Sequence, residues 1–291
     1  MFKKGFLLAM LTLAALPGTA ESGRKALMLT VFGTSTEASV TFDELAPLAQ
    51  EAFPQRDVVV PYTSGVIRNK LNAEISDPAQ KILSPAEMLE RLKGEGYTDI
   101  AVVSTLVFPG VENDKLNAAV NEFGKANKDI KVSYTPPLMS DAANLRAAVH
   151  ALGKHLLENG VNVVVSHGTH AGHPVEKVYL ELAAQVAQAY PNARLGSIEG
   201  VPDMTETLGW VKAQAAKNVR FVVFMFVAGD HAENDIASEA EDSLFSAVRA
   251  MGKTPSVVWA DTKDGKRIIS LGLDPDYRKI LLAYYLKQAP Q

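Results

Sequence analysis

The sequence predicts an α/β protein made of two Rossmann-like domains, each built on a parallel sheet. From Arg24 onward, short runs rich in β-branched residues alternate with amphipathic stretches, which is typical of βαβ units. The second half of the chain also repeats the plan of the first. Apolar residues make up 47% of the 291 residues, which supplies a real core and excludes a disordered chain.

Eight strands are expected, four in each half of the chain. In the first half they fall at residues 26–32, 57–60, 99–104 and 130–134. In the second half they fall at residues 161–166, 193–198, 220–225 and 256–259. Three helix starts between them combine a cap residue with an acid three positions later: Thr41 with Glu44, Ser84 with Glu87, and Asp203 with Glu206.

Two sequence echoes relate the halves. VFGTS at residues 31–35 follows the first expected strand as VSHGT at residues 165–169 follows the fifth. LVFPGVENDKL at residues 106–116 resembles FVAGDHAENDIA at residues 226–237. A duplicated domain explains both echoes, and generic loops of α/β proteins are the alternative explanation. We expect an N-terminal domain over residues 24–140, a C-terminal domain with the metal site over 141–270, and, within 271–291, a last helix over 275–287 that packs across the pair.

Residues 1–20 predict a secretory signal peptide. Two lysines precede an apolar stretch of about 12 residues, and small residues lead to a cleavage position after Ala20. No later segment reaches about 18 consecutive apolar residues, so no membrane span is expected. We therefore expect an exported, periplasmic protein. Its net charge changes from −4 to −6 once Lys3 and Lys4 are removed.

Composition and missing motifs exclude several kinds of chemistry. A net charge of −4 argues against a nucleic-acid binder, and the absence of cysteine removes thiol nucleophiles, disulfides and Cys-ligated clusters. No G-x-G-x-x-G fingerprint and no complete P-loop are present, so no nucleotide cofactor is expected. The G-x-S-x-G and H-E-x-x-H motifs of serine hydrolases and zinc proteases are also absent.

Three residues that can bind a metal follow expected strands of the second half. His167 and Glu199 directly follow the first and second of these strands, and His231 lies a few residues beyond the third. In open parallel sheets, ligand sites form beyond the carboxyl ends of strands, so these side chains are expected to converge. Imidazole and carboxylate together suit Co²⁺, Fe²⁺, Ni²⁺ or Zn²⁺.

The remaining histidines allow one alternative site. His167, His170 and His173 fall together in HGTHAGH and could form a metal site within one loop, although a glycine-rich connection would hold them loosely. His150 and His155 are five residues apart on an expected helix, a spacing that does not place both on one face. We expect both to be surface residues.

At these residues the sequence resembles the sirohydrochlorin cobaltochelatases of the anaerobic CbiK type, which are ATP-independent class II chelatases. The resemblance runs along nearly the whole chain after residue 20. It rests on LTVFGTS at 29–35, YTSGVIRNKL at 62–71, SHGTHAGHP at 166–174, GSIEGVPD at 196–203 and, above all, FVAGDHAENDIASE at 226–239. It implies two domains related by a pseudo-twofold axis, with a tetrapyrrole cleft between them.

The resemblance also implies roles for individual residues. The family's metal-binding histidines fall on His167 and His231, which would also take part in catalysis, and its metal-binding glutamate falls on Glu199. Some relatives have a histidine in the segment that corresponds to residues 105–108, where this chain has Val107, so any ligand role there is lost.

The implied substrates are Co²⁺ and sirohydrochlorin, a tetrapyrrole with eight carboxylates. Arg68 and Lys70 are candidates for binding these carboxylates, and solvated helix charges are the alternative interpretation. Backbone N–H groups at helix N-termini are further candidates. They lie around Gly33, Thr34, Ser64 and Gly65.

The leading hypothesis is an enzyme that inserts Co²⁺, or Fe²⁺, into sirohydrochlorin without ATP. The alternative is a periplasmic carrier that binds a metal, haem or another tetrapyrrole without catalysis, because cobalt insertion for corrinoid synthesis is cytoplasmic work whereas residues 1–20 predict export. A sugar- or amino-acid-binding protein of two lobes is a third hypothesis, and it leaves the histidines and Glu199 unexplained. A homo-oligomer is compatible with the sequence.

Overall fold

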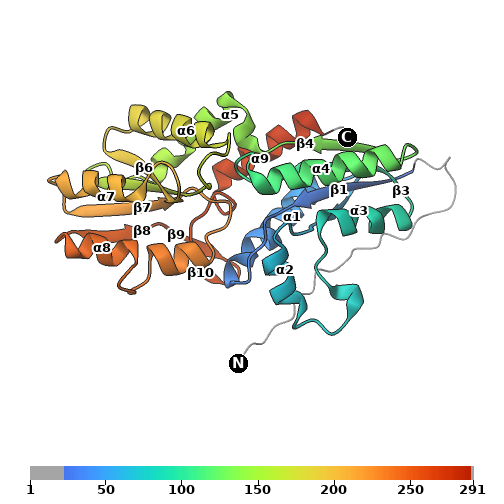
Figure 1. Ribbon diagram of the computed structural model, residues 1–291, viewed down its shortest axis with the longest axis horizontal. Coiled ribbons are helices and arrows are strands. Elements are labelled where there is room, and N and C mark those ends of the chain that lie inside the picture. The colour runs from blue at the N-terminus through green and yellow to red at the C-terminus, as the bar shows by residue number, and fades with distance from the viewer. Residues whose placement is uncertain (1–22, 290–291) are drawn as a thin grey trace.

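The computed structural model describes residues 23–289, and the signal peptide expected over residues 1–20 lies outside them. Two four-stranded parallel sheets form the framework (Figure 1). The first sheet, in the order β2-β1-β3-β4, contains β1 (Arg24–Thr30), β2 (Asp57–Val59), β3 (Tyr97–Ser104) and β4 (Lys131–Thr135). The second sheet, in the order β6-β5-β7-β8, contains β5 (Val161–Gly168), β6 (Ala193–Glu199), β7 (Asn218–Val223) and β8 (Thr254–Val257). A separate hairpin pairs β9 (Trp259–Thr262) with β10 (Gly265–Ile268).

Helices cover both faces of each sheet, as parallel sheets require. They are α1 (Val40–Ala52), α2 (Gly65–Asn72), α3 (Pro85–Gly94), α4 (Val111–Ala126), α5 (Ala142–Leu152), α6 (Glu176–Ala189), α7 (Met204–Ala213), α8 (Leu244–Ala250) and α9 (Pro275–Gln288). None of the helices within residues 23–289 has both the length and the apolar composition to cross a membrane.

Apolar packing divides into two outer cores and one shared core. One outer core joins β1 and β3 to α3 and α4, and the other joins β5 and β7 to α7 and α8. The opposite faces of both sheets meet α1, α5, α6 and α9 in one continuous core. The two halves are therefore fixed to one another by apolar packing and not by a flexible linker alone.

Helix α9 contributes polar contacts to this junction. The Tyr285 hydroxyl donates a 2.7 Å hydrogen bond to the Ser104 carbonyl in β3, and the Arg278 guanidinium lies 2.8 Å from Glu44 in α1. The chain thus returns from the second sheet to pack against the first.

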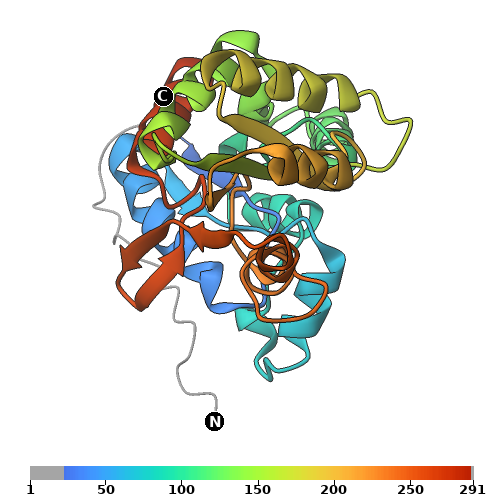
Figure 2. The same ribbon diagram turned by 90° about the vertical axis from the view of Figure 1, so that its left-hand side faces the viewer.

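The eight expected strands are confirmed, with one correction. The segment expected as one strand over residues 256–259 is split, because β8 pairs with β7 whereas Trp259 begins the β9–β10 hairpin. Figure 2 shows this hairpin beside the amino-terminal region. In the turn between β9 and β10, Nζ of Lys263 lies 3.0 Å from Oδ2 of Asp43 in α1. An Asp-Gly pair at residues 264–265 was the sequence signal for the turn.

The helix cap expected at Thr41 is wrong. Helix α1 begins at Val40, so Thr41 lies buried inside it. A 3₁₀ turn over Glu37–Ser39 runs directly into α1, and Thr36 caps this turn by accepting the N–H of Ala38. The helical segment therefore begins earlier than the cap pattern predicted.

The other two expected caps are confirmed. The Ser84 hydroxyl accepts the backbone N–H of Glu87, and the Glu87 carboxylate accepts the N–H of Ser84 in return, which forms a capping box. Asp203 accepts the N–H groups of Thr205 and Glu206 at the start of α7.

His155 is not the surface residue expected from the sequence, whereas His150 is exposed as predicted. Nε2 of His155 hydrogen-bonds to the buried carboxylate of Asp274, which also caps α9. Lys154 contacts the same carboxylate at 2.9 Å. Burial raises the pKa of Asp274, but hydrogen bonds from His155, the Tyr277 N–H and Lys154 outweigh it and hold the pKa well below the usual range. The buried carboxylate needs these donors, and this need accounts for the position of His155.

Candidate functional site

Loops at the carboxyl ends of the two sheets contact one another. A Cβ atom on Gly229, in the loop after β7, would lie 2.8 Å from Oγ1 of Thr34 in the loop after β1. Nε2 of His173, in the loop after β5, lies 3.4 Å from Asp114 in the first turn of α4. Since ligand sites of open parallel sheets form at these ends, the region between the loops is the candidate site.

Two of the expected metal-binding residues meet in this region. His167 lies near the end of β5, which continues beyond the expected strand to Gly168, and His231 is the first residue of a π-helix over His231–Ile236. The ring centroids of His167 and His231 are 5.0 Å apart, with an angle of 80° between the planes. Short π-helices are frequent at functional sites. The fold thus brings together two imidazoles that are far apart in the sequence.

Local hydrogen bonds orient both rings. Nδ1 of His231 lies 2.6 Å from Oδ2 of Asp235, four residues later, and Nδ1 of His167 lies 3.3 Å from the carbonyl of Gly168. Carboxylate and carbonyl oxygens only accept hydrogen bonds, so Nδ1 carries the proton in each neutral ring. The lone pair on each Nε2 is then available for a metal ion or a proton, as in metal sites where a second partner fixes the histidine tautomer.

Glu199 lies nearby, but its side chain faces a different histidine. It ends β6 beside Gly168, and its Oε2 lies 3.6 Å from Nδ1 of His170. The two side chains are 42% and 87% exposed, so water surrounds this pair and leaves Glu199 free to change rotamer. Within residues 23–289, no three side chains of the His, Cys, Asp and Glu types are close enough to hold a metal. The structure therefore assembles the histidine pair and leaves Glu199 beside it.

The alternative site within the HGTHAGH loop is not assembled. Nδ1 of His173 accepts the backbone N–H of Val175 at 3.1 Å, and its Nε2 faces Asp114. Both ring nitrogens of His173 are occupied by contacts that fix the loop and join it to α4. His170 points to Glu199, as described above.

Four expected substrate-binding residues lie in the connections after β1 and β2, up to the first residue of α2. Gly33 follows β1 with φ +102°, and a Cβ there would lie 2.3 Å from the Tyr62 ring, so glycine is needed. Thr34 is buried and accepts the N–H of Thr36. Ser64 caps α2 by accepting the Ile67 N–H, and Gly65 is the first residue of that helix. These residues place backbone N–H groups at the carboxyl end of the first sheet.

The two basic candidates on α2 differ in their surroundings. Arg68 is partly buried and lies 3.3 Å from Glu87 of α3, which itself belongs to the capping box. Lys70 is exposed, and within the described residues it makes no ion pair. Arg68 therefore links two helices, and Lys70 is the more available of the two for a carboxylate ligand.

Two titratable side chains near the histidines, Tyr179 and Glu233, have pKa values raised by burial. Burial raises the pKa of Tyr179, so the neutral phenol donates a 3.1 Å hydrogen bond to the Gly168 carbonyl. Partial burial also raises the pKa of Glu233 in the π-helix; Arg267 opposes this effect, and nearby carboxylates add to it. The Tyr179 contact fixes the carbonyl that in turn orients His167.

Sequence reasoning missed Asp235, which orients His231. Its signal was the spacing of four residues within HAEND, which places two side chains on one side of a helical turn. Val107, in the segment for which the resemblance suggested a lost histidine ligand, is buried in the shared core. It provides packing and no metal ligand.

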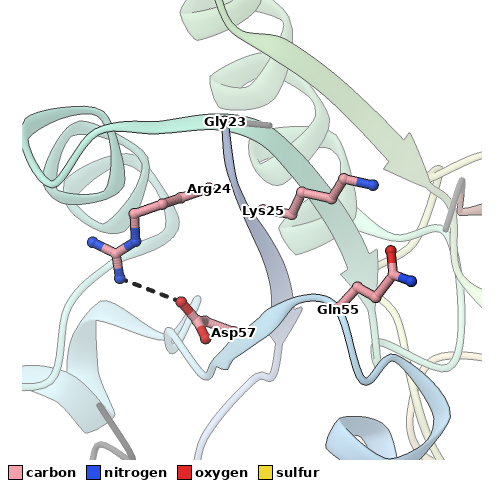
Figure 3. Close-up of a pocket in the computed structure, with 5 residues that line it drawn as sticks. All are labelled: Gly23, Arg24, Lys25, Gln55 and Asp57. Atoms are coloured by element: carbon pink, nitrogen blue, oxygen red, sulfur yellow. Dashed lines mark hydrogen bonds and ion pairs between the residues drawn. The ribbon is translucent and has the colours of Figure 1, made fainter. Parts of the chain in front are cut away.

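A separate hollow of about 440 Å³ lies at the amino ends of β1 and β2, away from the histidines. Figure 3 shows the ion pair between Arg24 and Asp57 on one side of β1 and the side chains of Lys25 and Gln55 on the other. It borders Gly23, the first described residue, and none of the candidate site residues lines it.

Comparison with known families and proteins supports one assignment. The model of the cobalt chelatase (CbiK) family matches residues 25–287. A sirohydrochlorin cobaltochelatase from Salmonella typhimurium is 29% identical over 268 residues, covering 90% of this chain and 95% of that protein. Sirohydrochlorin cobaltochelatase CbiKC from Nitratidesulfovibrio vulgaris is 27% identical over 259 residues, covering 86% of this chain and 89% of that protein.

Solved structures share the fold at much lower identity. SirB from Bacillus subtilis with Fe³⁺ matches with a TM-score of 0.62 and 13% identity, covering 91% of this chain and 96% of SirB. CbiX, a siroheme biosynthesis enzyme from denitrifying bacteria, matches with a TM-score of 0.53 and 14% identity, covering 91% of this chain and all of CbiX. The chain therefore shares the fold of these structures, and the α/β fold with two parallel sheets predicted from the sequence is confirmed.

Proposed function

Because the chain belongs to the cobalt chelatase (CbiK) family and is accordingly a metal chelatase, we propose that it inserts Co²⁺ into sirohydrochlorin without ATP. Fe²⁺ is the alternative metal, since imidazole and carboxylate ligands suit both ions. The observation that carries the proposal is the adjacent pair of imidazoles, His167 and His231, each with Nδ1 engaged and Nε2 available.

The histidine pair would receive the metal substrate. Nε2 of His167 and Nε2 of His231 would bind the ion, and Glu199 would join them after turning away from His170. The Asp235 carboxylate would offset part of the positive charge through His231. Two or three protein ligands leave open positions on the ion, so that pyrrole nitrogens can replace water before the protein releases it.

Insertion also requires the removal of two pyrrole protons for each divalent ion bound. A histidine that gives up the ion regains a free lone pair on Nε2, and this nitrogen can take one proton. Glu199, half-exposed at the strand end, can take the second and pass it to solvent. Charge is then balanced, because one divalent ion enters the ring as two protons leave.

The carboxylates of sirohydrochlorin would lie toward α2. Lys70 is exposed there, and the first turn of α2 at Gly65 presents backbone N–H groups that favour anions. Ser64 and Thr34 support this proposal less directly, since their hydroxyls already accept backbone N–H groups. We also propose that the protein acts in the periplasm, on the basis of the signal peptide expected over residues 1–20.

Anaerobic mixing of the protein with sirohydrochlorin and Co²⁺, followed by absorption, tests the proposal. We expect His167→Ala and His231→Ala to lower the insertion rate by about 100-fold or more, because each removes a ligand and a base. Asp235→Asn leaves the imidazole of His231 in place but no longer fixes which ring nitrogen carries the proton. This variant should weaken Co²⁺ binding by about 10- to 100-fold.

His150→Ala is the matched control, since His150 is exposed on α5 and takes no part in the site. Its rate should equal that of the wild type. Tight binding of sirohydrochlorin or haem, with no insertion above the spontaneous rate, would refute the enzyme and support a carrier. Faster insertion of Fe²⁺ than of Co²⁺ would show that Fe²⁺, and not Co²⁺, is the preferred metal substrate.

A further inference from the structure

The two sheets match strand for strand, so positions in one half have counterparts in the other. Strands β1, β2, β3 and β4 occupy the places of β5, β6, β7 and β8. A glycine with positive φ follows the histidine of β5 and also follows Phe32, namely Gly168 (φ +86°) and Gly33 (φ +102°). Phe32 is therefore the counterpart of His167.

The second histidine also has a counterpart. His231 is the first residue of the helical turn after β7, and Val111 is the first residue of α4 after β3. The same Glu-Asn-Asp triplet follows, at residues 112–114 and 233–235, with Ala232 as one additional residue in the second half. Counted from this triplet, Val111 matches Ala232, the residue directly after His231; counted from the start of the helical turn, Val111 takes the place of His231.

Both counterparts are exposed apolar side chains. Phe32 is 47% exposed and Val111 is 44% exposed, although the strands that precede them are buried. Val66, in the first turn of α2, is also exposed, and its helix is joined to Phe32 by a 3.1 Å hydrogen bond from the Ser64 N–H to the Phe32 carbonyl. Three of the six large apolar side chains exposed within residues 23–289 thus lie at the carboxyl end of the first sheet.

These apolar residues lie opposite the histidine loops. The loop that follows Phe32 meets Gly229, two residues before His231. The helical turn that begins at Val111 meets His173, in the loop that follows His167. The segments that carry Phe32 and Val111 therefore each contact a loop that carries one of the histidines.

We infer that Phe32, Val111 and Val66 form an apolar platform for one face of the tetrapyrrole ring, while His167 and His231 address the other face. This inference rests on the proposed function. The faces of a conjugated macrocycle are apolar and its carboxylates lie at the rim, so an aromatic ring and two aliphatic side chains match a face and not the rim. Because the platform contains no metal ligand, the ion enters from the histidine side only and meets no competing ligand beyond the ring.

The double variant Phe32→Ala/Val111→Ala tests the platform in the full chain. Titration with metal-free sirohydrochlorin, followed by absorption, should show about ten- to thirtyfold weaker binding, since most of the platform is removed. Equilibrium dialysis with Co²⁺ alone should give the wild-type affinity. His231→Ala should show the opposite pattern, with weaker Co²⁺ binding and retained tetrapyrrole binding.

Leu180→Ala is the matched control, because Leu180 is similarly exposed on α6, outside the platform. Phe32→Leu keeps an apolar side chain and should recover most of the tetrapyrrole affinity even if the double variant folds poorly. Unchanged tetrapyrrole binding in the double variant, with an active wild type, overturns the platform alone. A wild type that binds no sirohydrochlorin overturns the proposed function and the platform together.

Discussion

The two halves of the molecule share a backbone plan and differ in what they display at the carboxyl ends of their strands. Each half has the same strand order, and each places a left-handed glycine at or just beyond the carboxyl end of its first strand. The second half displays His167 and His231, whereas the first displays Phe32 in the place of His167 and Val111 at the start of the corresponding helical turn. A few side chains on a repeated framework thus separate a histidine-bearing side from an apolar one.

This difference has a physical basis. For insertion, the protein must release the metal to the tetrapyrrole ring. Protein ligands on both faces of the ring would instead hold the ion between them. In the proposed mechanism, one histidine-bearing side and one apolar side allow the ion to move in a single direction, from imidazole to pyrrole. The shared core through α5 and α9 packs the two sides against one another.

The largest expected effect concerns Gly168, the last residue of β5. Gly168 and Gly172 have nearly equal φ values of +86° and +88°, but a Cβ on Gly168 would lie 1.7 Å from the Glu199 carbonyl oxygen, whereas a Cβ on Gly172 meets nothing within 4 Å. Gly172→Ala should therefore cost about 1–3 kcal/mol from φ alone. Gly168→Ala should cost more than Gly172→Ala, with a total of at least about 3 kcal/mol, because backbone must move.

Urea unfolding of both variants measures this difference. Gly33→Ala extends the test to the first half, where the obstacle is the Tyr62 ring and not backbone, so its cost should fall between the other two. Equal unfolding free energies for Gly168→Ala and Gly172→Ala would show that the close approach of β5 to Glu199 is not rigid.

An intermediate effect is expected at the junction that keeps the halves in place. Asp274→Asn should lower the free energy of unfolding by about 1–3 kcal/mol at pH 7, since it weakens charge-assisted hydrogen bonds from His155 and Lys154. The native pKa of Asp274 is lower than the unfolded one, so its carboxylate stabilises the fold above about pH 4. This contribution is lost progressively as the pH falls below the unfolded pKa toward the native one.

Unfolding of the wild type and Asp274→Asn, followed from pH 7 downward, checks the sign. The difference in unfolding free energy between the wild type and the variant should become smaller below about pH 4. Asp242→Asn is the control, because Asp242 is exposed and, within the described residues, makes no ion pair. A gap that widens on acidification contradicts the assignment of the low pKa to the native carboxylate.

The sheets could be predicted from the sequence because each strand is a run of β-branched residues, which is a local pattern. It also predicted that His167 and His231 lie in one region, since the carboxyl ends of parallel strands share one edge. The rotamer of Glu199 was not predictable, because it depends on His170 in a loop without regular structure. His155 was placed wrongly, since its partner Asp274 lies 119 residues away and no local pattern reveals that contact.

The platform positions needed both the sequence and the fold. The echo of VFGTS and VSHGT was visible in the chain, but a letter-by-letter match pairs Phe32 with Ser166. Only the backbone shows that the two left-handed glycines correspond, which pairs Phe32 with His167. Repeats therefore locate equivalent loops, and backbone conformation decides which residues are equivalent within them.

The smallest effect is expected for the exposed lysine of α2. Lys70→Ala should raise the KM for sirohydrochlorin about two- to threefold at low ionic strength, because an exposed charge contributes little and salt screens it. Lys212 is an exposed lysine on α7, which follows β6 as α2 follows β2, and Lys212→Ala should leave KM unchanged. Initial rates at low and high salt distinguish the two. An effect of Lys70→Ala that persists at high salt would mean that Lys70 makes a shielded contact with the ring carboxylates. Equal effects of the two variants would mean that the net charge of the protein, and not α2, attracts the carboxylates at the rim of the ring.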